Sequence, residues 1–84
     1  MDVLDGNVIG GLLQEIFRAE MTTAAATCAV CGQTGPVAEC VVYLAAPGVV
    51  VRCRYCTAVL MVVTQHHGMN CVGLQGLAAL EPAR

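Results

Sequence analysis

The sequence predicts a small α+β domain in which an N-terminal amphipathic helix precedes an antiparallel β-sheet of three to four strands, held together by a metal ion. Three observations lead to this prediction. Apolar residues recur at helical spacing over residues 5–20, runs of alternating character follow residue 36, and four of the six cysteines form two Cys-x-x-Cys pairs. A chain of 84 residues buries little apolar surface, so a metal cross-link is expected.

The first expected element is a helix over residues 5–20. Its apolar stripe consists of three adjacent pairs, Val8/Ile9, Leu12/Leu13 and Ile16/Phe17. Asp5 is placed to cap the first free amides. Gly10 and Gly11 each cost about 1 kcal/mol relative to alanine inside a helix, so we expect the helix to depend on docking its stripe. Residues 21–27 are predicted to be a small-residue linker.

Strands are expected next, over 37–44, 49–52, 58–64 and about 69–74. Two turns separate them, a type II turn at Ala46-Pro47-Gly48-Val49 and a tighter one at His66-His67-Gly68. Leu74, Leu77 and Leu80 recur every third residue and predict a short helical turn. The chain is therefore expected to be one domain, 1–84, with a metal-binding ribbon over 28–65 and a C-terminal strand and helical turn over 66–84.

The two cysteine pairs are Cys28/Cys31 and Cys53/Cys56, with 21 residues between them. This is the spacing of a four-thiolate site, and it predicts one structural Zn²⁺ ion held by these four residues. With all four positions filled, the ion has no open coordination site for water or substrate. Redox switching and iron are the alternatives, although a rubredoxin-type iron site is usually surrounded by more aromatic residues.

The residues around the pairs fit a metal site to different degrees. Gly32 follows the second cysteine of the first pair, where a positive φ is needed, whereas Thr57 occupies the matching place in the second pair. Arg52 and Arg54 flank Cys53 and are expected to offset the thiolate charge.

Four further residues carry chemistry outside the two pairs. Cys40 and Cys71 lie on expected strands, where free cysteine most often behaves as a small buried hydrophobe. The alternative is that one of them exchanges with a ligand during oxidation. His66 and His67 are expected to be turn residues, with a role as auxiliary metal ligand as the alternative.

Composition limits the compartment and the partners. The chain is 57% hydrophobic and 12% charged, so some apolar area must stay exposed, which suggests a protein partner or a homodimer. The uncharged stretch 40–51 is shorter than the roughly 20 residues needed to cross a bilayer. The N-terminus lacks a secretory pattern, and we expect a cytoplasmic protein without membrane contact. The absence of lysine suggests a GC-rich bacterial genome.

The knuckle Cys28-Ala29-Val30-Cys31-Gly32 and the pair Cys53-Arg54-Tyr55-Cys56 together resemble a zinc ribbon over residues 27–65. Three further segments, Leu4-Asp5-Gly6-Asn7, Met21-Thr22-Thr23-Ala24 and Cys71-Val72-Gly73-Leu74-Gln75-Gly76-Leu77, extend the likeness to nearly the whole chain. Over that length the sequence is similar to an uncharacterised family of short bacterial proteins, a domain of unknown function with paired cysteines. The resemblance implies metal binding at the four cysteines and supplies no substrate or partner.

These observations favour a small zinc-binding protein that serves as a protein-interaction or dimerisation module. Two alternatives remain open, a nucleic-acid-associated ribbon and a thiol-based redox or zinc sensor. Charge opposes the first, because the formal charge of −2 becomes about −4 once four thiolates and one zinc are counted. Arg52, Arg54 and Tyr55 form the single basic patch near the cysteines. We expect no enzymatic activity and no small-molecule substrate, because no catalytic motif is recognisable.

Overall fold

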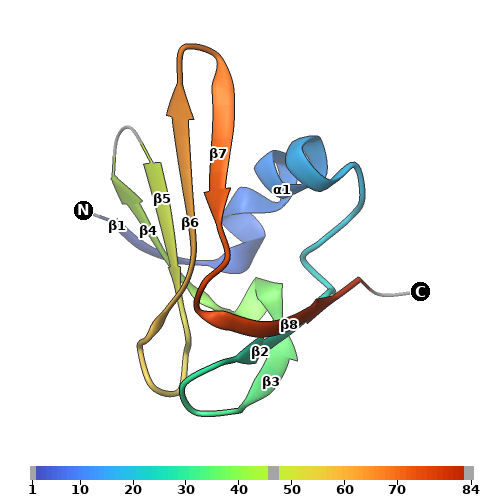
Figure 1. The fold of residues 1–84 in the computed structure, drawn as a ribbon, viewed down its shortest axis with the longest axis vertical. Helices are drawn as coiled ribbons and strands as arrows, with labels where there is room; N and C mark the ends of the chain where they lie inside the picture. Colours follow the sequence, from blue (N-terminus) through green and yellow to red (C-terminus); the bar gives the residue numbers. More distant parts are fainter. Residues whose placement is uncertain (1, 46–47, 83–84) are drawn as a thin grey trace.

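The computed structural model describes residues 2–45 and 48–82, and within them the chain is mostly β, with eight strands in two sheets. The five-stranded sheet has the order β1-β4-β5-β6-β7 and the three-stranded sheet the order β3-β2-β8. The strands are β1 (Asp2–Asp5), β2 (Ala25–Cys28), β3 (Thr34–Pro36), β4 (Val41–Ala45), β5 (Gly48–Arg52), β6 (Val59–His66), β7 (Met69–Gly73) and β8 (Leu77–Glu81). Figure 1 shows the three-stranded sheet crossing below the five-stranded one.

The predicted α+β class with three to four strands is therefore wrong. The helical part is a 3-10 helix η1 (Gly6–Ile9) followed by the short helix α1 (Gly10–Phe17). The prediction took the apolar pairs as one helix from residue 5, but residues 2–5 pair as an antiparallel strand with β4. Asp5 does act as a cap, since its Oδ1 accepts the Asn7 amide at 3.0 Å, but it caps the 3-10 turn.

Two further segments differ from the prediction. Part of the expected linker 21–27 forms β2, and the expected C-terminal helical turn is the strand β8, which pairs antiparallel with β2. The two strands lie about fifty residues apart in the sequence, so no local pattern indicates their pairing. The first of the expected strands, 37–44, also begins later than predicted. Val37–Glu39 is the 3-10 helix η2, and the strand β4 begins at Val41.

β3 was not expected either, but the four strands from β4 to β7 and one turn were predicted correctly in kind. β4, β5, β6 and β7 run as consecutive antiparallel neighbours. His67 and Gly68 both have positive φ, 50° and 78°, as the type I′ turn of a two-residue hairpin requires. Of the turn predicted at Ala46-Pro47-Gly48-Val49, residues 46 and 47 lie outside the described residues, and Gly48 already belongs to β5, where it pairs with Ala45.

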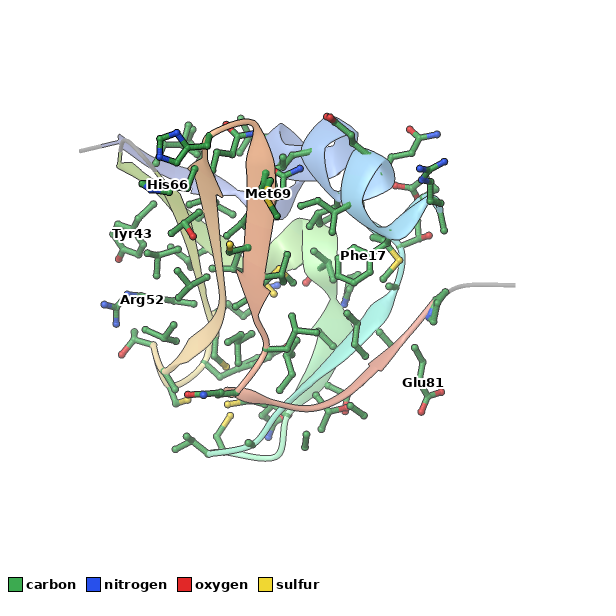
Figure 2. The ribbon with its side chains drawn as sticks, turned by 45° about the horizontal axis from the view of Figure 1, so that its top comes forward. Phe17, Tyr43, Arg52, His66, Met69 and Glu81 are labelled. Atoms are coloured by element: carbon green, nitrogen blue, oxygen red, sulfur yellow. The ribbon has the colours of Figure 1, made fainter. Side chains whose placement is uncertain are left out.

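Side chains alternate across the five-stranded sheet and divide it into an inner and an outer face. Val42, Val51 and Val63 are buried on the inner face. Figure 2 shows Phe17 of α1 on this side, while Tyr43 and Arg52 project from the other side of the sheet. The core is therefore enclosed by the two sheets, α1 and the 3-10 turns. In the described part of the chain, no helix has the length and apolar character to cross a bilayer.

Candidate metal centre

The four predicted ligands lie in two loops, one from each sheet. Cys28 ends β2 and Cys31 follows in the loop to β3, whereas Cys53 and Cys56 lie between β5 and β6. The four Sγ atoms all lie within 4.8 Å of one another. Figure 1 shows the two loops side by side at the lower end of the molecule. The structure thus brings together the four cysteines that the spacing singled out.

The sulfur positions fit a tetrahedral ion. The Cys28–Cys56 and Cys31–Cys53 Sγ–Sγ distances are both 3.6 Å. Four sulfurs placed about 2.3 Å from a central zinc have edges of about 3.8 Å, whereas a disulfide bond would bring two of them to about 2.05 Å. All six cysteines are free thiols. The arrangement can therefore hold one metal ion between the two pairs.

Both loops fold as the same tight turn. The Gly32 amide donates to the Cys28 carbonyl at 3.0 Å, and the Thr57 amide donates to the Cys53 carbonyl at the same distance. Backbone amides also point at sulfur, since the N–H groups of Val30 and Tyr55 donate to the Sγ atoms of the first cysteine of each pair at 3.4 Å. Such bonds stabilise thiolates, which are the metal-binding form.

The two turns differ in how well their closing residue suits them. Gly32 has φ 76° and Thr57 has φ 63°, so both occupy the left-handed region. The expectation for Gly32 is confirmed. The second turn adopts the same conformation with a β-branched residue, which costs backbone energy that glycine would avoid. Thr57 compensates in part, because its carbonyl accepts a hydrogen bond from Arg52 at 3.0 Å.

The thiols of the cluster differ in pKa. The pKa of Cys28 is lowered to about 6, chiefly by the hydrogen bond that its sulfur accepts from the Cys31 amide. Desolvation opposes this change, and the hydrogen bond from the Val30 amide lowers the pKa further. The backbone hydrogen bond from Gln33 would lower the pKa of Cys31, but desolvation and contacts with the other three thiols raise it to about 12. Without a metal, the cluster therefore keeps protons that a bound cation must displace.

In a comparison with protein-family models, residues 1–84 match a family of unknown function (DUF6510). The chain belongs to this family. No curated protein and no solved structure matches. The family carries no assigned activity, so the chemistry of this DUF6510 chain has to be inferred from its own residues.

The arginines beside the cluster already have partners. Arg54 forms an ion pair with Glu39, and its guanidinium also lies 5.5 Å from the centroid of the Tyr55 ring. Arg52 donates a hydrogen bond to the Thr57 carbonyl in the second turn, and its guanidinium carbon lies 5.5 Å from the Tyr43 ring centroid. Their expected role in offsetting thiolate charge stays a prediction. Glu39 gave no signal in the sequence, because fifteen positions separate it from its partner.

Gly76 is a second residue that sequence reasoning missed. A Cβ atom at this position would lie 1.8 Å from the Val59 carbonyl oxygen, so only glycine allows the chain to pass so close to β6. The Gly76 carbonyl accepts the Ala29 amide at 2.9 Å and so ties the first cysteine turn to the approach of β8. No metal-ligand pattern could have indicated this contact.

Cys40 and Cys71 do not share an environment. Cys40 is buried, 7% exposed, and desolvation raises its pKa, which confirms the expectation of a small buried hydrophobe. It lines a small, partly open hollow together with Cys28 and Cys53. Cys71 is exposed on β7, so the same expectation is wrong there. Its neighbour Val72 takes the inward position, which leaves the Cys71 side chain on the outer face.

The two histidines lie away from the cluster. His66 ends β6 and His67 forms the turn that follows, with ring centroids 4.3 Å apart. β6 begins near Cys56 and spans eight residues, about 26 Å at 3.3 Å per residue. Figure 1 shows this turn at the opposite end of the molecule from the cysteine loops. The alternative of an auxiliary metal ligand does not fit this placement.

Proposed function

We propose that Cys28, Cys31, Cys53 and Cys56 hold one structural zinc ion and that the chain acts as a non-catalytic protein-interaction module. The observation that carries the metal assignment is the convergence of four Sγ atoms within 4.8 Å of one another. Four cysteine thiolates in a tetrahedron are the donor set of structural zinc sites. Such a shell leaves the ion no position for a substrate, which favours a structural over a catalytic role.

The placement of the ligands explains what the ion would stabilise. One pair belongs to the three-stranded sheet and the other to the five-stranded sheet. A bound ion therefore cross-links the two sheets at one end of the core. Structural zinc contributes about 10–16 kcal/mol of apparent binding free energy in small finger peptides, which is comparable to or larger than the roughly 5–15 kcal/mol that holds a typical domain folded. The fold is proposed to depend on the ion.

The interaction role rests on the outer face of the five-stranded sheet. Tyr43, Val50 and Val62 are cross-strand neighbours on this face, and each is partly exposed. The face continues to Val59, which is 38% exposed. An apolar surface of this kind is typical of a protein contact. Arg52 is its one charged side chain among the residues of β4–β7.

The interaction role is tested by comparing two single substitutions with the native protein in affinity capture. Val62→Lys places a charge in the centre of the outer face, and we expect it to abolish binding of the captured partner. Val30→Lys adds the same charge at a side chain that is 73% exposed in the first cysteine turn, and we expect binding to persist. Equal capture by all three proteins would contradict the assignment to this face.

The metal assignment is tested separately, by removing zinc with a strong chelator and recording near-UV circular dichroism and amide dispersion. Loss of the folded signals on chelation, and their recovery on adding zinc, is the expected result. A folded spectrum that persists after demonstrated metal removal would contradict it.

One observation favours a thiol sensor as a second candidate. Cys40 lines the same hollow as Cys28 and Cys53, so a fifth thiol lies beside the ligands. Peroxide titration with a zinc-responsive dye tests this role, because a sensor releases its metal stoichiometrically and a purely structural site resists mild oxidant. Nucleic-acid binding is less favoured, since the ion pair with Glu39 neutralises Arg54 in the single basic patch.

A further inference from the structure

Within residues 2–45 and 48–82, β7 is an edge strand of the five-stranded sheet, and its sequence has none of the features that usually protect an edge. Natural edges are protected by charges, proline or bulges. β7 contains neither charge nor proline, and its register with β6 is continuous. No Asp, Glu, Lys or Arg occurs between Arg54 and Glu81. The opposite edge, β1, carries Asp2 and Asp5.

The backbone of β7 has a defined pattern of free groups. In a hairpin closed by a two-residue turn, the residues that flank the turn exchange the first ladder bonds, and bonded and non-bonded pairs then alternate. His66↔Met69 and Thr64↔Cys71 are the bonded pairs on this pattern. Asn70 and Val72 therefore direct their N–H and C=O groups away from β6, toward the open side.

We propose that this edge pairs with the β7 edge of a second copy of the chain, antiparallel and centred on Cys71, to join two five-stranded sheets into one. This contact goes beyond the proposed function, because it uses the β7 edge and leaves the outer face of the sheet free for another protein. A two-fold axis at Cys71 places Asn70 opposite Val72 of the other copy. These are the residues with free backbone groups, so each of the two resulting pairs makes two hydrogen bonds.

The side chains fit the same register. Met69 is 68% exposed and falls opposite Gly73 of the second copy, whose missing side chain leaves room for it. Cys71 of one chain falls opposite Cys71 of the second copy. The two residues form a non-hydrogen-bonded pair, in which facing side chains are closest. No like charges meet along the contact, whereas self-pairing of β1 would bring acidic residues together. Figure 1 shows the β6–β7 hairpin projecting beyond β4 and β5.

The test is the assembly state of the zinc-loaded protein in native mass spectrometry and multi-angle light scattering, from micromolar to submillimolar concentration. We expect a concentration-dependent dimer. Cys71→Asp places two acids opposite each other and should raise the dissociation constant by more than about tenfold. Gln14→Asp adds the same charge at an exposed position of α1 and should leave the dimer unchanged.

A short bismaleimide gives a second readout that does not depend on oxidation. It should link two native chains through Cys71, and Cys71→Ser should dimerise without being linked. A zinc-loaded monomer at every concentration would overturn the proposed dimer while leaving the metal site intact. A dimer that Cys71→Asp does not weaken would overturn the β7 contact. Metal content is read in the same spectra, so failure of the zinc site is distinguished from failure of pairing.

Discussion

Exchanging the residues that close the two cysteine turns should change stability in opposite directions. Thr57 has φ 63° and Gly32 has φ 76°. A left-handed conformation costs a non-glycine residue about 1–2 kcal/mol, and a β-branched residue is at the upper end. Replacing threonine with glycine removes this cost, but glycine loses more conformational freedom on folding, which offsets about 0.5–1 kcal/mol of the gain. Thr57→Gly should therefore stabilise the protein by about 1 kcal/mol, or about 4–8 °C in Tm.

The reverse exchange provides the comparison. A Cβ atom at Gly32 would meet nothing within 4 Å, so Gly32→Thr changes the backbone energy without a clash and should destabilise by about 1 kcal/mol. Thr57→Ala removes the hydroxyl but keeps the strain, and we expect little gain from it. Thermal unfolding by circular dichroism at one fixed free zinc concentration measures all three variants. A Thr57→Gly protein that melts below the native one would refute the reasoning.

Two other glycines and the thiol cluster give further predictions. Gly76→Ala should destabilise by about 3 kcal/mol or more, because its Cβ would lie 1.8 Å from a carbonyl oxygen of β6. Gly11→Ala should stabilise by about 1 kcal/mol, since this α1 position has nothing within 4 Å of the added Cβ. Urea titration of both variants at one fixed free zinc concentration measures these changes, and similar effects at both sites would contradict the packing. Zinc binding at pH 7 should release at least two protons, because the pKa of Cys31 is raised to about 12 and that of Cys56 is also raised. Zinc affinity should then fall by at least about a hundredfold per pH unit of acidification, one decade per proton displaced. Calorimetry in buffers of different ionisation enthalpy measures the number of protons released. An affinity that does not change with pH would contradict this prediction.

The sequence identified the cluster because metal geometry acts locally. A two-residue spacer lets both sulfurs of a pair face one ion, and the hairpin β4–β5 leads directly into the second pair. The adjacent hairpins from β4 to β7 were also predictable, since each closes through a short connection. Where residues contact partners only a few positions away in the sequence, the sequence pattern therefore predicted the structure.

The rest of the fold depends on contacts between distant residues. The sequence predicts a linker over most of β2, because the four small residues Ala25–Cys28 are too few to indicate a strand without the partner β8. The helix predicted over residues 5–20 was too long at both ends: pairing with β4 makes Asp5 extended, Gly6–Ile9 is a 3-10 helix, and α1 ends at Phe17, before Arg18 in the left-handed conformation. Glu39 beside Arg54 likewise follows from tertiary structure, for which the local pattern carries no signal.

Metal content bears most directly on the account. Native mass spectrometry of cleanly reduced protein, with elemental analysis of the same sample, should find one zinc ion per chain. Replacing Cys28 and Cys53 with serine should remove both the ion and the dispersed amide spectrum, since each pair then loses a ligand. Protein that contains no transition metal, or a doubly substituted chain that stays folded, would contradict the claim that one ion joins the two sheets.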